Sequence, residues 1–296
     1  MNSHPLHILL TGASGFVGGA IHRALAADGH RVRPISRRDG VDFRDMQNPQ
    51  DWRPHLNDID AVINCVGIIG ETRTQRFAAL HIAAPQALFR ACEHAGVRRV
   101  LQISALGADE TAFSAYHRSK RAADEALRAM DVDGFVLRPS LIYGRGGRSS
   151  ALFMRLAALP LIPVIGDGRQ RLQPVHISDV VATVRQCLVS SQLRQTLDIV
   201  GSESLSFAEW LQWMRRAQGL PPGRFLHIPF ALAMAGAQLA RYLDPLLHPD
   251  NLRMLQRGSE ADVRPLAQFL GRMPLAIDAA LFFGELAPDA NARHSK

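Results

Sequence analysis

Tyr116 and Lys120 lie four residues apart in the string Tyr116-His117-Arg118-Ser119-Lys120. On a helix, residues at this spacing share a face, so the phenol and the ammonium would project into the same space. An ammonium beside a phenol favours the phenolate, and we predict that Lys120 lowers the pKa of Tyr116 from its ordinary value of about 10. The pair is therefore a candidate for proton transfer near neutral pH.

Lysine is rare in this chain. Among 34 Lys and Arg residues, only Lys120 and Lys296 are lysine. The planar, delocalised cation of arginine does not reproduce a compact ammonium, so a lysine at position 120 of such an arginine-rich chain favours a specific chemical role. The alternative is a solvated lysine on an exposed helix.

Ser104 is the third candidate catalytic residue. It ends the apolar run Val100 to Ser104, which we expect to be a strand, and ligands bind beyond the carboxyl ends of parallel strands. In our working hypothesis, Ser104 holds a substrate oxygen, Tyr116 exchanges a proton with that oxygen, and Lys120 contacts the ribose of a nicotinamide cofactor. A hydride moves between the substrate carbon and the nicotinamide.

Apolar runs bounded by turn residues alternate with segments of helical period up to about residue 200, which is typical of βαβ units. We therefore expect an α/β fold with a Rossmann-type doubly wound parallel sheet. The predicted strands are Leu6 to Thr11, Arg31 to Ser36, Ala61 to Cys65, Val100 to Ser104, Phe135 to Pro139 and Thr196 to Val200. The predicted helices are about Gly15 to Ala27, about Thr74 to Ala95, and one that contains Tyr116 and ends near Met130.

The pattern changes near the middle of the chain. A short apolar helix is predicted near Leu152 to Leu159, and the chain is mostly helical from about Ser206. We expect a dinucleotide-binding domain over residues 1–200, in which residues 145–175 extend toward the substrate side. Residues 201–296 are expected to form a smaller substrate or interface region.

A glycine-rich loop directly follows the first predicted strand. Gly12, Gly15 and Gly18 have the spacing Gly-x-x-Gly-x-x-Gly and open the first predicted helix. The first glycine permits a tight turn, the second lets the backbone approach a pyrophosphate, and the third allows close packing of the helix, whose N-terminus attracts anions. The expected cofactor contacts are Gly12, Ser14, Gly15, Phe16, Val17 and Gly18. The alternative is a plain glycine turn.

The residues after the second predicted strand indicate which dinucleotide is bound. An NAD site usually has Asp or Glu there to bind the ribose 2′-hydroxyl, whereas this chain has Ser36, Arg37 and Arg38. A hydroxyl and two guanidiniums suit a 2′-phosphate, so NADP(H) is the preferred cofactor and NAD(H) the alternative. Asp42 and Phe43 are expected to flank the adenine. Arg37 and Arg38 are alternatively two more surface residues of an arginine-rich chain.

These motifs resemble the short-chain dehydrogenase/reductase superfamily, in its extended or atypical branch. The glycine loop, Ser104 and the Tyr116-x-x-x-Lys120 spacing are joined by residues 64–67 and 138–144. The resemblance implies a bound nicotinamide dinucleotide whose nicotinamide is contacted by Cys65, Val66, Gly67, Pro139 and Ile142.

Other stretches resemble narrower groups. Residues 163–180 are similar to the NAD-dependent epimerase/dehydratase type, and the Asp250-Asn251-Leu252 region resembles bacterial relatives of the 39-kDa accessory subunit of NADH–ubiquinone oxidoreductase. Where many members have an asparagine that supports a proton relay, this chain has His81. That histidine is either a relay group with a near-neutral pKa or a histidine satisfied in the core.

The composition sets limits on partners and compartment. The net charge of +7 is spread over single and paired arginines, so we expect no nucleic-acid partner. The widely separated Cys65, Cys92 and Cys187 favour neither disulfides nor a metal site. We see no secretory signal and expect a cytoplasmic protein, either free or peripheral to the inner membrane.

Three functions are compatible with these observations. The first is an NADP(H)-dependent oxidoreductase that acts on a carbonyl or alcohol carbon of a small molecule. The second is an accessory or assembly protein that retains NADPH as a structural ligand and associates with a membrane or a respiratory complex through the apolar helix predicted at Phe230 to Leu243. The third is a nucleotide-sugar epimerase or dehydratase, which the short interval between Ser104 and Tyr116 disfavours. The substrate and the oligomeric state stay open.

Overall fold

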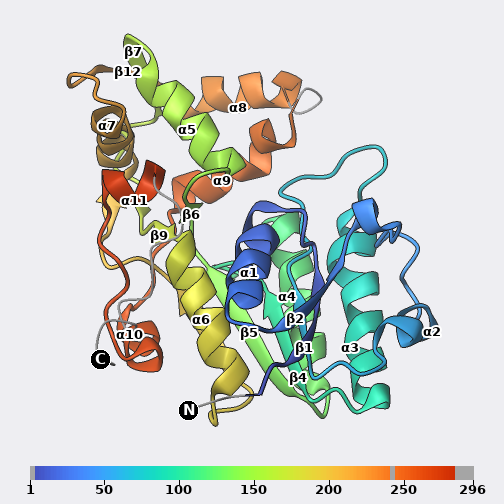
Figure 1. Cartoon of the computed structure of the whole chain (residues 1–296). Coiled ribbons are helices and arrows are strands. Elements are labelled where there is room, and N and C mark those ends of the chain that lie inside the picture. Colours follow the sequence, from blue (N-terminus) through green and yellow to red (C-terminus); the bar gives the residue numbers. More distant parts are fainter. Residues whose placement is uncertain (1–3, 241–243, 284–296) are drawn as a thin grey trace, which may run out of the picture.

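A six-stranded parallel sheet forms the centre of the computed structural model, which describes residues 4–240 and 244–283 (Figure 1). The order of the strands is β2-β1-β3-β4-β5-β10. Their bounds are β1 His7–Thr11, β2 Arg31–Ile35, β3 Ala61–Asn64, β4 Arg99–Ile103, β5 Asp133–Pro139 and β10 Thr196–Ile199. The six predicted strands and the Rossmann-type α/β fold are thus confirmed.

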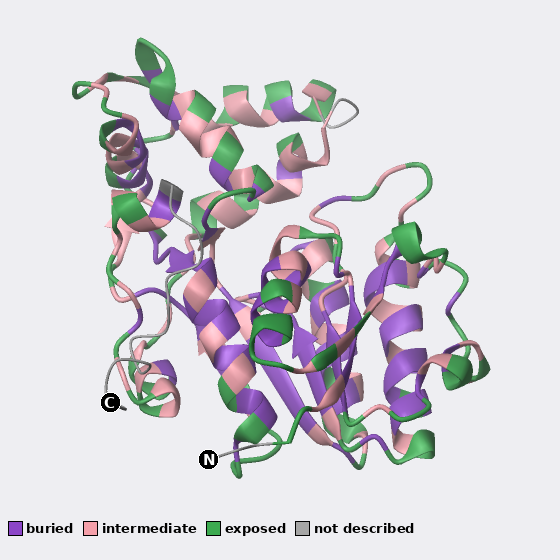
Figure 2. Ribbon diagram, viewed as in Figure 1, coloured by how far each residue is buried: buried purple, intermediate pink, exposed green. Residues whose placement is uncertain are grey.

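Helices cover both faces of this sheet. One face carries α1 (Phe16–Ala27) and α6 (Ile177–Val189), and the other carries α3 (Ala84–Ala95) and α4 (Ala115–Ala129), with the short α2 (Pro49–Trp52) beside α3. Successive strand residues point to opposite faces, and in the inner strands β1, β3, β4 and β5 both faces are buried (Figure 2). Strands of this kind read as continuous apolar runs, which is why the sequence predicted them.

The strand order reverses between β1 and β3. From β1 the chain crosses to β2 on one side, and then returns to β3 on the other side. In open α/β sheets a crevice for ligands forms at such a switch point, beyond the carboxyl ends of the strands. The loops that follow β1 and β3 are therefore the walls of a binding site.

The helix expected from about Thr74 begins later in the structure. Residues Ala78–Ala83 form a π-helical segment, and regular α-helix starts at Ala84. Pro85 has no N–H to donate to the carbonyl four residues earlier, so the α-helical ladder is interrupted there. π-helical segments are frequent at functional sites, and this one carries His81.

A further hydrophobic cluster lies above the carboxyl ends of the strands (Figure 1). In it, α5 and α7 pack against each other and against the two-stranded ribbon β7–β12, with the rings of Tyr143 and Trp210 in contact at its centre. The elements of this part are β6 Ile142–Tyr143, α5 Arg148–Ala158, β7 Leu161–Ile165, β8 Arg171–Leu172, β9 Val175–His176, β11 Leu205–Ser206, α7 Phe207–Ala217, β12 Arg224–Ile228, α8 Phe230–Ala240, α9 Pro249–Arg257 and α11 Ala279–Phe283. Helix α10 (Arg264–Leu270) packs instead against α6 and β10.

Sequence reasoning was less accurate in this part. The strand β12 was missed, because its parallel partner β7 is far away in the sequence and a short strand depends on its partner. The helix expected near Leu152 begins earlier, at Arg148, because its first turn is polar and lacks an apolar period. The helix expected at Phe230 to Leu243 is observed as α8, and its last three predicted residues lie outside the described residues.

No helix of the described ranges is long and apolar enough to cross a membrane.

A buried carboxylate on α6 binds the segment that connects α10, which packs beside the sheet, with α11, which belongs to the cluster above it. Asp179 is fully buried; one oxygen lies 2.7 Å from the guanidinium of Arg272, and the other accepts a hydrogen bond of 2.8 Å from the backbone N–H of Leu275. Asp179 thereby holds the segment that follows α10 against the helix that covers the sheet.

We expect Asp179→Ala to destabilise the protein by about 2–4 kcal/mol, because it removes a buried ion pair and a charge-assisted hydrogen bond. Urea unfolding followed by circular dichroism measures the difference. Asp167→Ala is the matched control, since the Asp167 side chain is largely exposed and such substitutions stay within about 0.5 kcal/mol. Equal effects of the two substitutions would contradict the connecting role of Asp179.

Candidate functional site

One cavity of about 1480 Å³ lies between the carboxyl edge of the sheet and the elements above it. Small-molecule sites usually occupy roughly 300–1,000 Å³, so the cavity has room for a dinucleotide and a second ligand. Its lower wall is formed by the loops after β1, β3, β4 and β5, and its upper wall by α5, α8 and α9.

The glycine loop forms one end of the cavity. Gly12 has a φ of +70°, and a Cβ added there would lie 2.9 Å from the backbone of Cys65. A Cβ added at Gly18 would overlap the carbonyl oxygen of Gly12. The loop is therefore folded tightly on itself and beside the loop that follows β3, and only glycine fits at both positions.

The loop residues predicted to bind a cofactor divide into two groups. Gly12, Ser14, Gly15 and Phe16 line the cavity, whereas Val17 and Gly18 lie in the first turn of α1 and do not. Gly18 allows close packing, as its spacing predicted, but the atoms packed against it belong to the glycine loop. The backbone of the glycine loop and the N-terminus of α1 fit the pyrophosphate of a dinucleotide.

The residues after β2 form the next part of the wall. Ser36 and Arg37 line the cavity, whereas Arg38 is exposed and does not. The Ser36 hydroxyl donates a hydrogen bond of 2.6 Å to Asp39 and accepts one from the backbone N–H of Arg38. The structure therefore brings one of the two predicted arginines to the cavity.

Asp42 and Phe43 also line the cavity. Asp42 forms an ion pair of 2.6 Å with Arg44, whose hydrogen bond holds the pKa of that carboxyl below its usual value. The ring of Phe43 packs edge-on against Trp52. Both residues lie beside Ser36 and Arg37, where an adenosine group was expected.

Lys120 is buried behind the cavity wall. Its ammonium donates hydrogen bonds to the backbone carbonyls of Val66 (3.3 Å) and Ile103 (3.0 Å), at the ends of β3 and β4. A Cβ added at Gly67 would lie 3.0 Å from this ammonium, so a glycine makes room for it. Burial lowers the pKa of Lys120 to about 8, and Lys120 thus keeps its charge at neutral pH.

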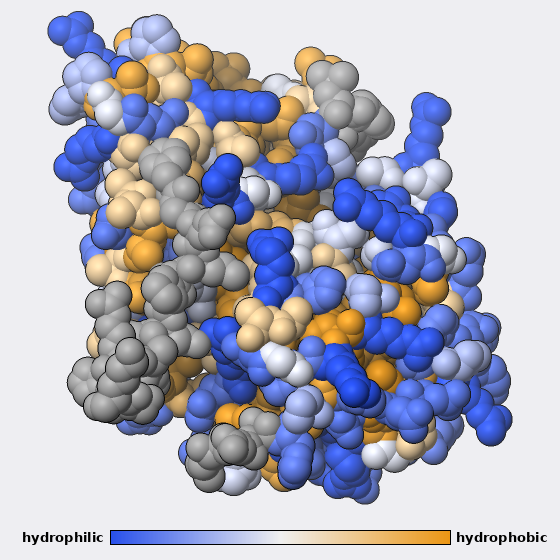
Figure 3. Space-filling model, in the orientation of Figure 1, coloured by the Kyte–Doolittle hydropathy of each residue, from blue (hydrophilic) through white to orange (hydrophobic). Residues whose placement is uncertain are grey.

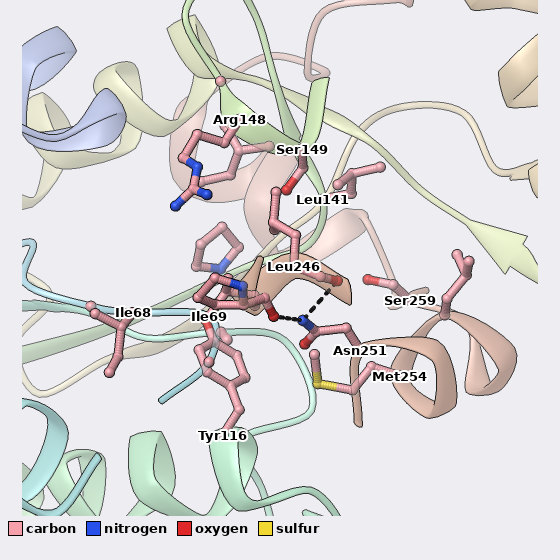
Figure 4. Close-up of a pocket in the computed structure, with 18 of the residues that line it drawn as sticks. Ile68, Ile69, Tyr116, Leu141, Arg148, Ser149, Leu246, Asn251, Met254 and Ser259 are labelled. Atoms are coloured by element: carbon pink, nitrogen blue, oxygen red, sulfur yellow. Dashed lines mark hydrogen bonds between the residues drawn. The ribbon is translucent and has the colours of Figure 1, made fainter. Parts of the chain in front are cut away.

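Tyr116 projects from α4 into the cavity, below Ile69 and Leu246 (Figure 4). Its pKa differs from the prediction: burial, with a smaller contribution from the charge of Asp124, raises the pKa of Tyr116 to about 12. The prediction that Lys120 lowers this pKa is wrong for the free protein. Loss of hydration disfavours the phenolate, and the Lys120 ammonium is directed at the carbonyls of Val66 and Ile103.

Ser104 is not brought to the cavity. Its hydroxyl is buried and donates a hydrogen bond of 2.5 Å to Asp124, one turn after Lys120 on α4. The residue that lines the cavity at this point is Ala105, which has no hydroxyl. The structure therefore does not place Ser104 where it would hold a substrate oxygen, because the buried carboxylate of Asp124 binds its hydroxyl on the other side.

Asp124 lies in a buried network behind α4. Arg138 lies 3.7 Å from the oxygen that accepts the Ser104 hydrogen bond, and burial raises the pKa of Asp124 to about 6. Sequence reasoning missed this residue, although its spacing of four from Lys120 was a usable signal.

His81 is the satisfied core histidine of the two alternatives. Its Nε2 accepts a hydrogen bond from the backbone N–H of Ile68 (2.9 Å), and its Nδ1 lies 2.8 Å from the hydroxyl of Ser119, which donates to the carbonyl of Tyr116. These partners assign the proton to Nδ1. Burial and the charge of Lys120 keep the pKa of His81 well below its usual value, so the ring stays neutral.

The predicted contacts of the nicotinamide lie together. Cys65, Val66, Gly67, Pro139 and Ile142 all line the cavity beside Tyr116. Burial raises the pKa of the Cys65 thiol to about 12, so this cysteine is a packing residue rather than a nucleophile.

A family model supports this arrangement. The model described as "NAD dependent epimerase/dehydratase family" matches residues 8–197, which include the glycine loop, Tyr116 and Lys120. This chain belongs to that family. The superfamily resemblance drawn from the motifs is thereby confirmed.

Three proteins with assigned names are similar over much of this chain. A protein named ceramide reductase, from Caulobacter vibrioides, is 30% identical over 75% of this chain and 73% of its own length. Subunit 9 of the NADH dehydrogenase 1 alpha subcomplex, from Arabidopsis thaliana, is 30% identical over 76% of this chain, which spans 61% of that subunit. Sterol demethylase protein B, from Methylococcus capsulatus, is 25% identical over 92% of this chain and 95% of its own length.

Solved structures of other proteins have the same fold. UDP-glucuronic acid 4-epimerase from Bacillus cereus, in complex with NAD, has a TM-score of 0.70 at 18% identity and covers 94% of this chain and 96% of its own. dTDP-4-dehydrorhamnose reductase from Bacillus anthracis, in complex with NADP, has a TM-score of 0.66 at 17% identity and covers 78% and 87%. At these identities the likeness concerns the fold alone.

Residues 145–175 and 201–296 were predicted to form a substrate or interface region, but sequence reasoning named no binding residue of the upper wall. Asn251 on α9 donates through its amide nitrogen to the carbonyls of Pro245 (2.9 Å) and Leu246 (3.1 Å), which holds that loop above Tyr116 (Figure 4). The region around Asn251 was noted as a family resemblance, but its packing over the cavity depends on contacts between segments far apart in the chain.

We expect Gly18→Ala to weaken NADPH binding at least about tenfold and to destabilise the protein by about 1–3 kcal/mol, because the new methyl group overlaps the loop backbone. Fluorescence titration with NADPH and urea unfolding measure the two effects. Gly19→Ala, one residue later in the same helix, is the control: its Cβ would lie 3.3 Å from the nearest atom, and alanine favours the helix by about 1 kcal/mol. Normal NADPH binding by Gly18→Ala would show that the loop does not form the cofactor site.

Proposed function

We propose that this protein is an NADP(H)-dependent oxidoreductase that acts on a carbonyl or alcohol carbon of an apolar small molecule. The single observation that carries the proposal is the buried ammonium of Lys120, directly behind the cavity wall at Gly67 and one helical turn from Tyr116. A buried cation is costly unless it is paired or hydrogen-bonded, and here two backbone carbonyls bind it. The family and the relative named ceramide reductase support an enzyme of this class.

In the proposed reaction, Tyr116 is the general acid. A bound nicotinamide dinucleotide supplies a hydride to the substrate carbon or accepts one from it. With a pKa of about 12, Tyr116 is protonated at neutral pH and donates its proton to the oxygen of a carbonyl substrate. Lys120 has a positioning role in this scheme, because its hydrogen bonds to the carbonyls of Val66 and Ile103 hold α4 where Tyr116 lines the cavity. Ser104 acts indirectly in this scheme, because its hydroxyl holds Asp124 rather than the substrate.

The lining of the cavity favours an apolar substrate. Many hydrocarbon side chains line the cavity: Ile68, Ile69, Leu141, Leu152, Phe153, Leu156, Leu246, Leu252, Met254 and Leu255. Arg148, Ser149 and Asn251 add polar groups near Tyr116 (Figure 4). A lining with this much hydrocarbon suits an apolar ligand better than a nucleotide sugar, whose many hydroxyl groups all require partners. Two relatives carry lipids in their names, ceramide and sterol, and this is consistent with an apolar substrate.

An accessory role is the second candidate function, and the similarity to a subunit of NADH dehydrogenase favours it. In that case the dinucleotide would stabilise the fold by binding only to the folded protein. Association with a respiratory complex stays a prediction of this second hypothesis.

We expect Tyr116→Phe to lower the rate of NADPH-dependent carbonyl reduction about 10²–10⁴-fold, with NADPH binding unchanged, because only the proton donor is removed. A panel of apolar ketones, with NADPH oxidation as the readout, measures the rate. Tyr143→Phe is the matched control, since that hydroxyl lies in the aromatic cluster away from the cavity wall. If no ketone is reduced by the unmodified protein although NADPH binds, the accessory function is favoured.

We expect NADPH to bind more tightly than NADH, and Arg37→Ala to weaken NADPH binding about tenfold or more while leaving NADH binding unchanged. The loss corresponds to a charge-assisted contact with the 2′-phosphate. Arg38→Ala, at the exposed neighbour that does not line the cavity, is expected to change neither affinity. Binding of NADH at least as tight as that of NADPH would exclude the assignment.

A further inference from the structure

The wall of the cavity continues to the surface along the ribbon β7–β12. On this ribbon Ile162 and Val164 face the hydrophobic cluster, so the alternate residues face the other way. On that second face, Pro163, Ile165 and Ile228 line the cavity. The same face ends in Leu161 and Leu226, whose exposed fractions are 51% and 49%. An apolar strip therefore runs from the cavity to the solvent.

Helix α8 repeats this arrangement on the adjacent wall. Its sequence, FALAMAGAQLA, has no charged residue, and only Ala237 is buried. Ala233, Gly236, Ala237 and Ala240 line the cavity, whereas Leu232 and Leu239 are 65% and 80% exposed. A helix with so few polar residues is normally buried, yet within residues 4–240 and 244–283 the side chains of Leu232 and Leu239 on the outer side of α8 stay exposed.

We call Leu161, Leu226, Leu232 and Leu239 the apolar rim. The elements that carry it, β7, β12 and α8, lie at the same end of the molecule, away from the sheet (Figure 1). The space-filling view shows hydrophobic residues at this end, with hydrophilic side chains between them (Figure 3). Exposed apolar patches that polar residues surround are typical of surfaces that bind another protein or a membrane.

The charges near the apolar rim indicate which kind of partner binds there. Neither Arg148 to Ile165 nor Trp210 to Ala240 contains an aspartate or glutamate. The same segments carry the exposed Arg155, Arg216 and Arg224, none of which has an ion pair with a carboxylate of the described residues. A second copy of this chain would bring like charges together, whereas an anionic lipid surface complements both the leucines and the arginines.

We propose that the apolar rim docks on the surface of an anionic lipid bilayer, with the mouth of the cavity facing the lipid. The leucines enter the boundary between headgroups and acyl chains, and the arginines contact lipid phosphates. Under the proposed function, on which this last point rests, an apolar substrate then reaches Tyr116 from the bilayer without crossing water.

The test is binding of the full chain to vesicles, which does not depend on turnover. Vesicles of equal parts phosphatidylglycerol and phosphatidylcholine are mixed with the protein and separated by flotation. We expect the unmodified protein to float with these vesicles and at least tenfold less protein to float with pure phosphatidylcholine. The double variant Leu232→Glu, Leu239→Glu is expected to lose at least tenfold in binding to the anionic vesicles.

The matched control is Val189→Glu. Val189 is an equally apolar, 61% exposed residue at the end of α6, at the opposite end of the molecule from α8 (Figure 1), and this variant is expected to bind vesicles normally. NADPH titration and thermal unfolding verify that each variant is folded. If the double variant fails to fold, Leu226→Glu on the ribbon replaces it.

The proposal is overturned if the unmodified protein does not float with anionic vesicles, or if the double variant and Val189→Glu bind equally well. It is also overturned if sedimentation shows that the rim forms a dimer that the double variant abolishes, with no binding to vesicles. Docking is supported if the double variant loses vesicle binding but still reduces ketones at the normal rate. Vesicle binding without any reduction also supports docking but contradicts the proposed function.

Discussion

A buried ammonium holds the floor of the cavity together. Lys120 comes from α4, and its hydrogen bonds end on the carbonyls of Val66 and Ile103, which follow or end two neighbouring strands. Because a buried charge requires such partners, the helix can take only one position relative to the two strands. That position puts Tyr116, one turn earlier, on the cavity wall. It also explains Gly67, since a side chain there would press on the ammonium.

The same face of α4 extends one turn further, to Asp124. This carboxylate is buried, binds the Ser104 hydroxyl and lies near Arg138. Its negative charge raises the pKa of Tyr116, in the same direction as burial. The tyrosine therefore stays protonated in the free protein, which suits a proton donor in a reduction. Ser104, which was predicted to hold the substrate oxygen, binds Asp124 instead, and Ala105 lines the cavity wall at this point.

The cavity combines two kinds of surface. The loops after β1, β2 and β3 contribute glycine backbone, a helix N-terminus and Arg37, which suit an anionic dinucleotide. The opposite side is made of α5, α8, α9 and the ribbon β7–β12, and is mainly hydrocarbon. These elements cannot bury all of their own apolar surface, so the apolar lining continues to the outside of the molecule. The proposed substrate and the proposed membrane contact both follow from that second surface.

Local physics made part of this structure predictable from the amino-acid order. Strands buried on both faces must be apolar throughout, and a tight turn before a helix must have glycine at Gly12 and Gly18, so both features are visible without coordinates. The spacing of Tyr116 and Lys120 similarly follows from the helical repeat. The directions of individual side chains cannot be predicted from the amino-acid order. Whether Ser104 faces the substrate or Asp124, and whether Arg37 or Arg38 reaches the cavity, depends on neighbours that are distant in the chain. The pKa of Tyr116 was predicted with the wrong sign for the same reason: it is governed by loss of hydration and by the charge of Asp124, and the loss of hydration exists only in the folded protein.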